Sequence, residues 1–138
     1  MDNFSKHTFK TIAYTEYNPG QKNCILFLPP ASHGESPPAI LIDLLRSLGT
    51  VVYINSGYFG INRIGHTQNI FVQNLHDLLD TKKFCKICIV AGSVGAIHAI
   101  ELYLHDPKNF TSIVMCAPAF RKYAPVKNWF SLIALRLL

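Results

Sequence analysis

The sequence contains no apolar run long enough to cross a membrane. Its longest apolar stretch, residues 87–100, is interrupted by two glycines, a serine and a histidine, whereas a membrane-spanning helix needs about 20 consecutive apolar residues. The amino terminus also lacks the apolar core of a secretion signal. We therefore expect a cytoplasmic protein without a transmembrane segment, in which the four cysteines stay reduced.

Charged residues are few and dispersed. They make up 15% of the chain, and the 13 basic residues, set against 8 acidic ones, occur singly or in pairs. A nucleic-acid-binding surface would need a basic stripe interleaved with aromatic residues, so we expect no nucleic-acid partner.

Metal and redox chemistry have little support. Cys85 and Cys88 have the spacing of a zinc or redox pair, but they lead into an apolar strand, and no second pair supplies the remaining ligands. We therefore expect no metal and no cofactor.

The 138 residues, 49% of them hydrophobic, suffice for one domain spanning residues 1–138 with a core that needs no disulfide. Apolar and β-branched runs predict strands, and apolar residues at helical spacing predict helices between them. We expect strands at residues 9–17, 24–28, 50–55, 87–90 and 111–116, and helices at 39–48, 67–80 and 95–105. The first strand is expected at the outside, in a hairpin with the second. The alternation predicts an α/β fold with a mainly parallel sheet.

The most informative segment is the turn at residues 90–96, where a strand leads directly into a helix with Ser93 at the apex. A nucleophile elbow has this form: its apical residue adopts an unusual backbone conformation, and the positions two before and two after must be small. Ala91 and Gly95 satisfy that requirement. The amide of Val94, at the start of the helix, would stabilise negative charge on a bound carbonyl oxygen. Alternatively, the glycines only permit close packing and Ser93 caps the helix.

Over nearly its whole length the sequence resembles the amino-terminal half of the α/β-hydrolase superfamily. Residues 91–95, Ala-Gly-Ser-Val-Gly, are similar to the family's small-x-Ser-x-Gly motif, with Ala91 in place of the commoner glycine. Residues 7–14 are similar to an early strand of the family, and residues 24–28 to the strand before its oxyanion loop. The resemblance implies a three-layer sandwich in which Ser93 is the nucleophile, as in esterases, lipases and thioesterases.

The oxyanion loop departs from the family pattern. Pro29 and Pro30 follow the strand, and proline has no N–H group to donate. The second oxyanion donor would then be the amide of Ala31, with that of Ser32 next.

The acid and the histidine that follow the serine in the family are not recognisable. Beyond Ser93 the only histidines are His98 and His105, about 7.5 and 18 Å farther along the helix axis, so neither can be the general base. The loop of His33 should face the elbow, although a solvated loop histidine is the simpler interpretation. The chain therefore resembles a truncated hydrolase that lacks the carboxyl-terminal strands, with little or no turnover expected.

Two functions follow from this pattern. The first is a serine hydrolase that cleaves a small carboxylic ester or thioester through an acyl-serine intermediate. The second is a non-catalytic α/β domain that binds a ligand or a partner chain through a sheet edge left open. The apolar segment 121–138 resembles the start of a cap or lid, and its apolar surface could join two protomers in a homo-oligomer.

Overall fold

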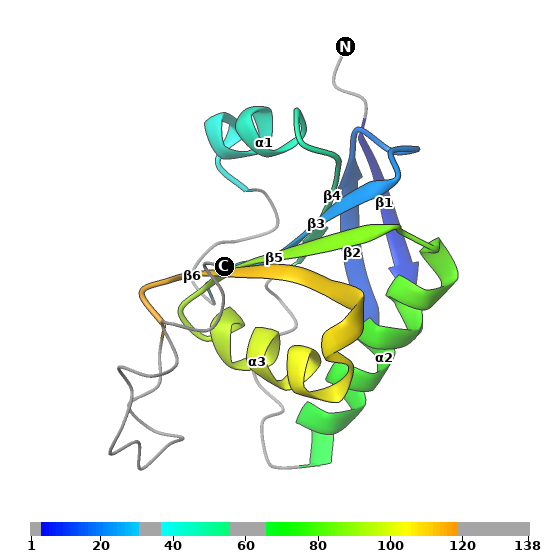
Figure 1. Cartoon of the computed structure of the whole chain (residues 1–138), viewed down its shortest axis with the longest axis vertical. Coiled ribbons are helices and arrows are strands. Elements are labelled where there is room, and N and C mark those ends of the chain that lie inside the picture. Colours follow the sequence, from blue (N-terminus) through cyan, green and yellow to red (C-terminus); the bar gives the residue numbers. More distant parts are fainter. Residues whose placement is uncertain (1–3, 31–36, 56–65, 119–138) are drawn as a thin grey trace.

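Figure 1 shows the computed structural model of the chain, in which residues 4–30, 37–55 and 66–118 are described. A six-stranded sheet forms its centre. The strands are β1 (Phe4–Phe9), β2 (Ile12–Tyr17), β3 (Asn23–Leu28), β4 (Thr50–Ile54), β5 (Lys86–Gly92) and β6 (Phe110–Cys116). The helices are α1 (Ala39–Leu45), α2 (His66–Lys82) and α3 (Gly95–His105), and a 3-10 turn, η2 (Pro107–Asn109), precedes β6.

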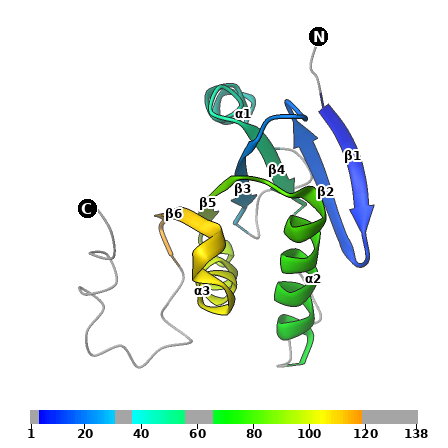
Figure 2. The same ribbon diagram turned by 45° about the vertical axis from the view of Figure 1, so that its right-hand side comes forward.

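The sheet is mainly parallel, with the strand order β1-β2-β4-β3-β5-β6. Strands β4, β3, β5 and β6 run parallel, whereas β1 and β2 form an antiparallel hairpin and β2 pairs antiparallel with β4. Helices α2 and α3 cover one face of the sheet and α1 lies on the other (Figures 1 and 2). The predicted three-layer α/β architecture is confirmed.

The amino-terminal region differs from the sequence prediction. A turn at Lys10, where φ is +52°, divides the single strand expected over residues 9–17 into β1 and β2. The expected hairpin with β3 is also wrong, because β4 lies between β2 and β3. β2 is therefore an inner strand, with four of its six residues buried, and β1 is the outer one.

Helix α1 is shorter than its apolar pattern predicts. Arg46 caps it, and Gly49 lies beyond a further turn. A Cβ atom on Gly49 would lie 2.5 Å from the carbonyl oxygen of Asn23, so this glycine is needed for close contact with β3 and does not cap the helix.

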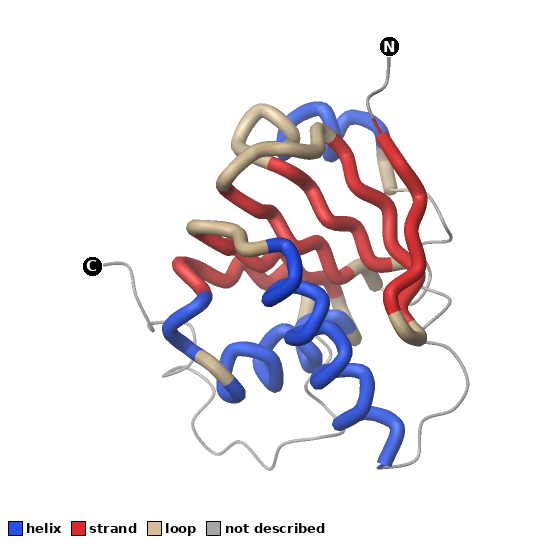
Figure 3. The backbone as a smooth tube through the Cα atoms, turned by 90° about the vertical axis from the view of Figure 1, so that its right-hand side faces the viewer, coloured by secondary structure: helices blue, strands red, loops and turns tan. Residues whose placement is uncertain are grey.

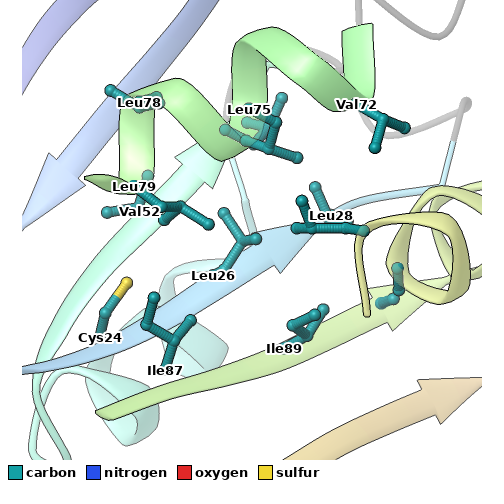
Figure 4. Packing of buried hydrophobic residues seen from close by; sticks show 14 of the residues in the cluster. Cys24, Leu26, Leu28, Val52, Val72, Leu75, Leu78, Leu79, Ile87 and Ile89 are labelled. Atoms are coloured by element: carbon teal, nitrogen blue, oxygen red, sulfur yellow. The ribbon is translucent and has the colours of Figure 1, made fainter. Parts of the chain in front are cut away.

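The core lies on both faces of β3. The side chains of Cys24, Leu26 and Leu28 are buried toward α2 and α3 (Figure 4), and those of Ile25 and Phe27 are buried toward α1. Figure 3 shows the two longer helices side by side under the sheet. No helix among the described residues is long and apolar enough to span a membrane.

A buried ion pair joins β2 to the end of α2. Glu16 is only 6% exposed, and its carboxylate accepts a hydrogen bond from Nζ of Lys82 at 2.6 Å. Partial burial acts against the charge of Lys82, but the hydrogen bond to Glu16 and the charge of Glu16 outweigh it, so the pKa of Lys82 is raised. The pair thus fixes α2 against the antiparallel end of the sheet.

Candidate active site

Ser93 lies at the carboxyl end of β5, between the last residue of that strand and the start of α3. β5 is flanked by β3 and β6 in the parallel part of the sheet, and Figure 1 shows how it leads directly into α3. The φ angle of Ser93 is +49°, a left-handed conformation that is costly for residues other than glycine. The sequence-based expectation of a sharp strand-to-helix turn at this position agrees with the geometry.

The positions around Ser93 are crowded by the end of β3. A Cβ atom on Gly95 would lie 2.3 Å from the carbonyl oxygen of Leu28, a distance that no side chain tolerates. A Cβ atom on Gly92 would lie 3.0 Å from Cδ of Pro30, and Ala91 is almost fully buried. The two positions that the elbow motif keeps small, 91 and 95, are therefore closely packed, and position 95 has no room for a side chain.

Backbone contacts with β6 also hold the turn. The N–H of Ser93 donates a hydrogen bond to the carbonyl oxygen of Cys116 at 3.1 Å, and Ala117, directly after β6, also has a positive φ of +45°. Two adjacent strands thus end in left-handed residues at the same edge. The alternative interpretation, in which the Ser93 side chain caps the helix, has no hydrogen bond in its favour among the described residues, since no side chain caps α3 there.

The Val94 amide lies at the amino end of α3. The first amides of a helix have no carbonyl partner within it, and they carry the positive end of the helix dipole. Val94 directly follows Ser93 at the start of α3. The other two predicted donors, Ala31 and Ser32, lie outside the described residues, as does His33.

Comparisons with known proteins identify the fold. No family model and no curated protein matches the sequence. An α/β hydrolase enzyme from a sediment metagenome of the Mar Chica lagoon, Morocco, superposes with a TM-score of 0.67 at 17% identity, over 86% of this chain and 54% of its own. A serine hydrolase from Cycloclasticus zankles superposes with a TM-score of 0.64 at 20% identity, over 92% of this chain and 49% of its own. A deformylase from Pseudomonas putida S16 superposes with a TM-score of 0.64 at 15% identity, over 94% of this chain and 54% of its own.

The chain has the α/β-hydrolase fold. It spans about half the length of these solved structures. The resemblance seen in the sequence is therefore confirmed at the level of the fold, and the assignment of individual site residues stays a prediction.

The histidines of α3 contact α2. The ring of His98 contacts that of Phe71 on α2, with centroids 4.9 Å apart, and burial lowers the pKa of His98 to about 4. His105 lies at the far end of α3, where it bonds to Gln73 at 3.1 Å. Both contacts are with α2, which agrees with the expectation that neither histidine is the base.

A polar cluster that the sequence pattern does not reveal lies where α2 meets the end of α3. Nδ1 of His76 lies 3.2 Å from a carboxylate oxygen of Asp80, and Nε2 lies 3.6 Å from one of Asp106. The His76 ring also stacks on that of His105, with centroids 5.0 Å apart. Only the spacing of His76 and Asp80, four residues apart on a helix, could have indicated it.

No group of three or more metal-ligating side chains occurs within the described part of the chain. Cys88 has Ser112 as its neighbour, 3.0 Å from its sulfur, and Cys85 is exposed at the start of β5. These observations give the cysteine pair no recognisable role at the elbow.

Proposed function

We propose that Ser93 is the nucleophile of a serine hydrolase that cleaves carboxylic ester or thioester bonds through an acyl-serine intermediate. The observation behind this proposal is the left-handed conformation of Ser93, φ +49°, at the carboxyl end of a central parallel strand. A left-handed serine is expensive for the fold, and a nucleophile elbow accounts for that strain because the turn exposes the hydroxyl.

The chemistry would proceed in two steps. The Ser93 hydroxyl attacks the carbonyl carbon, its proton passes to a base, and the alkoxide or thiolate leaves as an acyl-serine forms; water then attacks the acyl-serine and releases the acid. The Val94 amide would bind the oxyanion in both steps, together with an amide of Ala31 or Ser32. These assignments rest on the position of Val94 at the start of α3 and on the absence of an N–H in Pro29 and Pro30.

No described histidine is placed to act as the general base for Ser93. Among the described histidine side chains, His7 lies beside Glu16, His76 beside Asp80, and the two histidines of α3 contact α2. A base for Ser93 would have to come from residues outside the described ranges or from a second chain. We therefore expect reactivity well below that of a complete triad, since an oxyanion hole alone retains only a small part of the catalysis.

A fluorophosphonate probe tests the proposal, because it labels only an activated serine. We expect labelling of the purified chain that Ser93→Ala abolishes. Ser112→Ala is the matched control: Ser112 is an exposed serine on the neighbouring strand β6, and its loss should leave labelling unchanged. Labelling that survives Ser93→Ala, or no labelling after prolonged incubation, would contradict an activated Ser93.

The second candidate is a non-catalytic domain that binds a small acyl ligand or a partner chain. The engagement of the described histidines away from Ser93 favours it. The fold does not decide between the two candidates, since a likeness at 15–20% identity shows the fold and not the activity. A rise in melting temperature with a free carboxylic acid, without any probe labelling, would support this candidate over the first.

A further inference from the structure

Each described carboxylate has a lysine, arginine or histidine nitrogen within 4 Å. For three of the six the partner is a lysine or arginine, and for the other three it is a histidine, which carries charge only when protonated. The pairs are Glu16 with Lys82, Asp43 with Arg46, Asp77 with Lys10, Asp80 and Asp106 with His76, and Glu101 with His98. The positive charge that remains is therefore available for an external partner.

Four lysines without a carboxylate partner among the described residues gather at one edge of the sheet. Lys22 directly precedes β3, Lys86 begins β5, Lys83 lies in the turn between α2 and β5, and Lys108 lies in η2 just before β6. β3, β5 and β6 are neighbouring parallel strands, so their amino ends meet at this edge. All four lysines are exposed.

Backbone contacts bring these lysines together. The N–H of Cys85 donates to the carbonyl oxygen of Lys22 at 2.8 Å, and Lys86 pairs with Asn23 in the register of β5 and β3. Neighbouring strands lie about 4.8 Å apart. Lys22 and the Lys83–Lys86 turn are thus adjacent across the start of two strands.

An exposed leucine lies beside this basic group. Leu48, in the turn before β4, is 60% exposed, and the next residue, Gly49, packs against the Asn23 carbonyl that follows Lys22. We call Leu48, Lys22, Lys83, Lys86 and Lys108 the amino-edge surface.

We propose that the amino-edge surface docks this protein on a lipid bilayer that carries anionic headgroups. Lysine is a compact, flexible point charge that suits a diffuse layer of phosphates and carboxylates, whereas recognition of one phosphate geometry favours the arginine fork. An exposed leucine among lysines suits the boundary between headgroups and acyl chains. A nucleic-acid surface would combine the charge with exposed aromatic rings on which bases stack, whereas the ring between these lysines, Phe84, is half-buried and packs against the core.

Docking in this way sets the orientation of the fold. The seven residues of β5, at about 3.3 Å each, span roughly 23 Å from the amino edge to Ser93. The elbow would then face away from the bilayer, toward water-soluble substrates. The inference does not rest on the proposed hydrolase activity, because none of its residues belongs to the elbow.

Vesicle co-sedimentation tests the proposal with the full chain. Vesicles of phosphatidylcholine alone are compared with vesicles that contain phosphatidylserine, at low, physiological and high salt. Each lysine near an anionic surface strengthens binding roughly fivefold; Lys86→Glu both removes that attraction and reverses it, so we expect about 25-fold weaker binding to the anionic vesicles. Lys22 and Lys83 lie outside the strands, so Lys22→Glu and Lys83→Glu should weaken binding to a similar extent. They provide the test if Lys86→Glu folds poorly.

Lys6→Glu is the matched control. Lys6 is also exposed and without a carboxylate partner among the described residues, but it lies within β1, three strands from β3. It changes the net charge equally and should weaken binding only a few-fold, since salt screens charges beyond about 10 Å. Leu48→Ser should weaken binding several-fold at every salt concentration, because its contribution is apolar.

Three results would overturn the proposal. Equal binding to neutral and anionic vesicles would exclude charge recognition. An equal loss from Lys6→Glu and Lys86→Glu would show that net charge alone decides. Binding to a short DNA duplex through the same lysines, with no binding to vesicles, would assign the surface to nucleic acid.

Discussion

Replacing Ser93 with glycine should make the protein more stable. Ser93 holds φ +49°, and a left-handed conformation costs a non-glycine residue roughly 1–2 kcal/mol. The added freedom of glycine in the unfolded chain offsets about 0.4–1 kcal/mol of this. Within the described residues the Ser93 hydroxyl makes no hydrogen bond whose loss would oppose the gain. We expect a net increase of about 0.5–1 kcal/mol in the free energy of unfolding, or a Tm rise of about 2–4 °C.

Urea denaturation followed by circular dichroism measures this difference. Ser93→Ala removes the hydroxyl but keeps a Cβ atom and therefore the strain, so its stability should stay near that of the parent. Lys83→Gly is a second control, because Lys83 holds a similar φ of +53° in an ordinary turn and should gain as much. A glycine variant at position 93 that is no more stable than the alanine variant, while Lys83→Gly gains, would refute a strained elbow.

Three further perturbations follow from the same structure. Gly95→Ala should lower the free energy of unfolding by about 3 kcal/mol, measured by urea denaturation, because its Cβ would lie 2.3 Å from a backbone oxygen. Gly20→Ala is the control: its Cβ would have nothing within 4 Å, so its positive φ should lower the free energy of unfolding by only about 1 kcal/mol. Burial lowers the pKa of His98 to about 4, so folding favours its neutral form. This contribution to the free energy of unfolding is fully present above pH 6.5, and about 2 kcal/mol of it should be lost when the pH falls to 5. In thermal melts, His98→Phe should make stability less dependent on pH over this range. Glu16→Gln should cost about 2 kcal/mol by leaving the charge of Lys82 partly buried, and adding Lys82→Met should recover part of it in a double-mutant cycle.

The parts of the fold that sequence predicts well depend on local pattern. The apolar run at β3 predicts a strand buried on both faces, and all its residues from Cys24 to Leu28 are buried. Helix α3 has the predicted limits, residues 95–105, because glycine and proline mark its ends. The order of the amino-terminal strands fails for the opposite reason: whether β2 pairs with β3 or β4 depends on contacts distant in sequence, and a turn at residues 18–20 fits either arrangement.

The candidate site divides in the same way. The elbow is predictable because Ser93 and its small neighbours lie within five residues of one another. The environment of His98 is not, because it depends on Phe71 from another helix. The sequence excludes His98 as a base by its distance along the helix, and the contact with α2 gives the reason for its lowered pKa.

The carboxyl and amino ends of the parallel strands lie at opposite edges of the sheet, so the proposed serine nucleophile and the proposed membrane-docking surface can be tested separately. The carboxyl ends of β5 and β6 are followed by the left-handed residues Ser93 and Ala117, whereas the amino ends of β3 and β5 carry lysines that have no carboxylate partner in the described part of the chain. Perturbations more than about 10 Å apart without shared partners act independently. Ser93→Ala should therefore leave vesicle binding unchanged, and Lys86→Glu should leave probe labelling unchanged in the absence of lipid. If anionic vesicles alter the labelling rate of the parent but not of Lys86→Glu, then docking at one edge changes the elbow at the other, and the rigid-sheet argument fails.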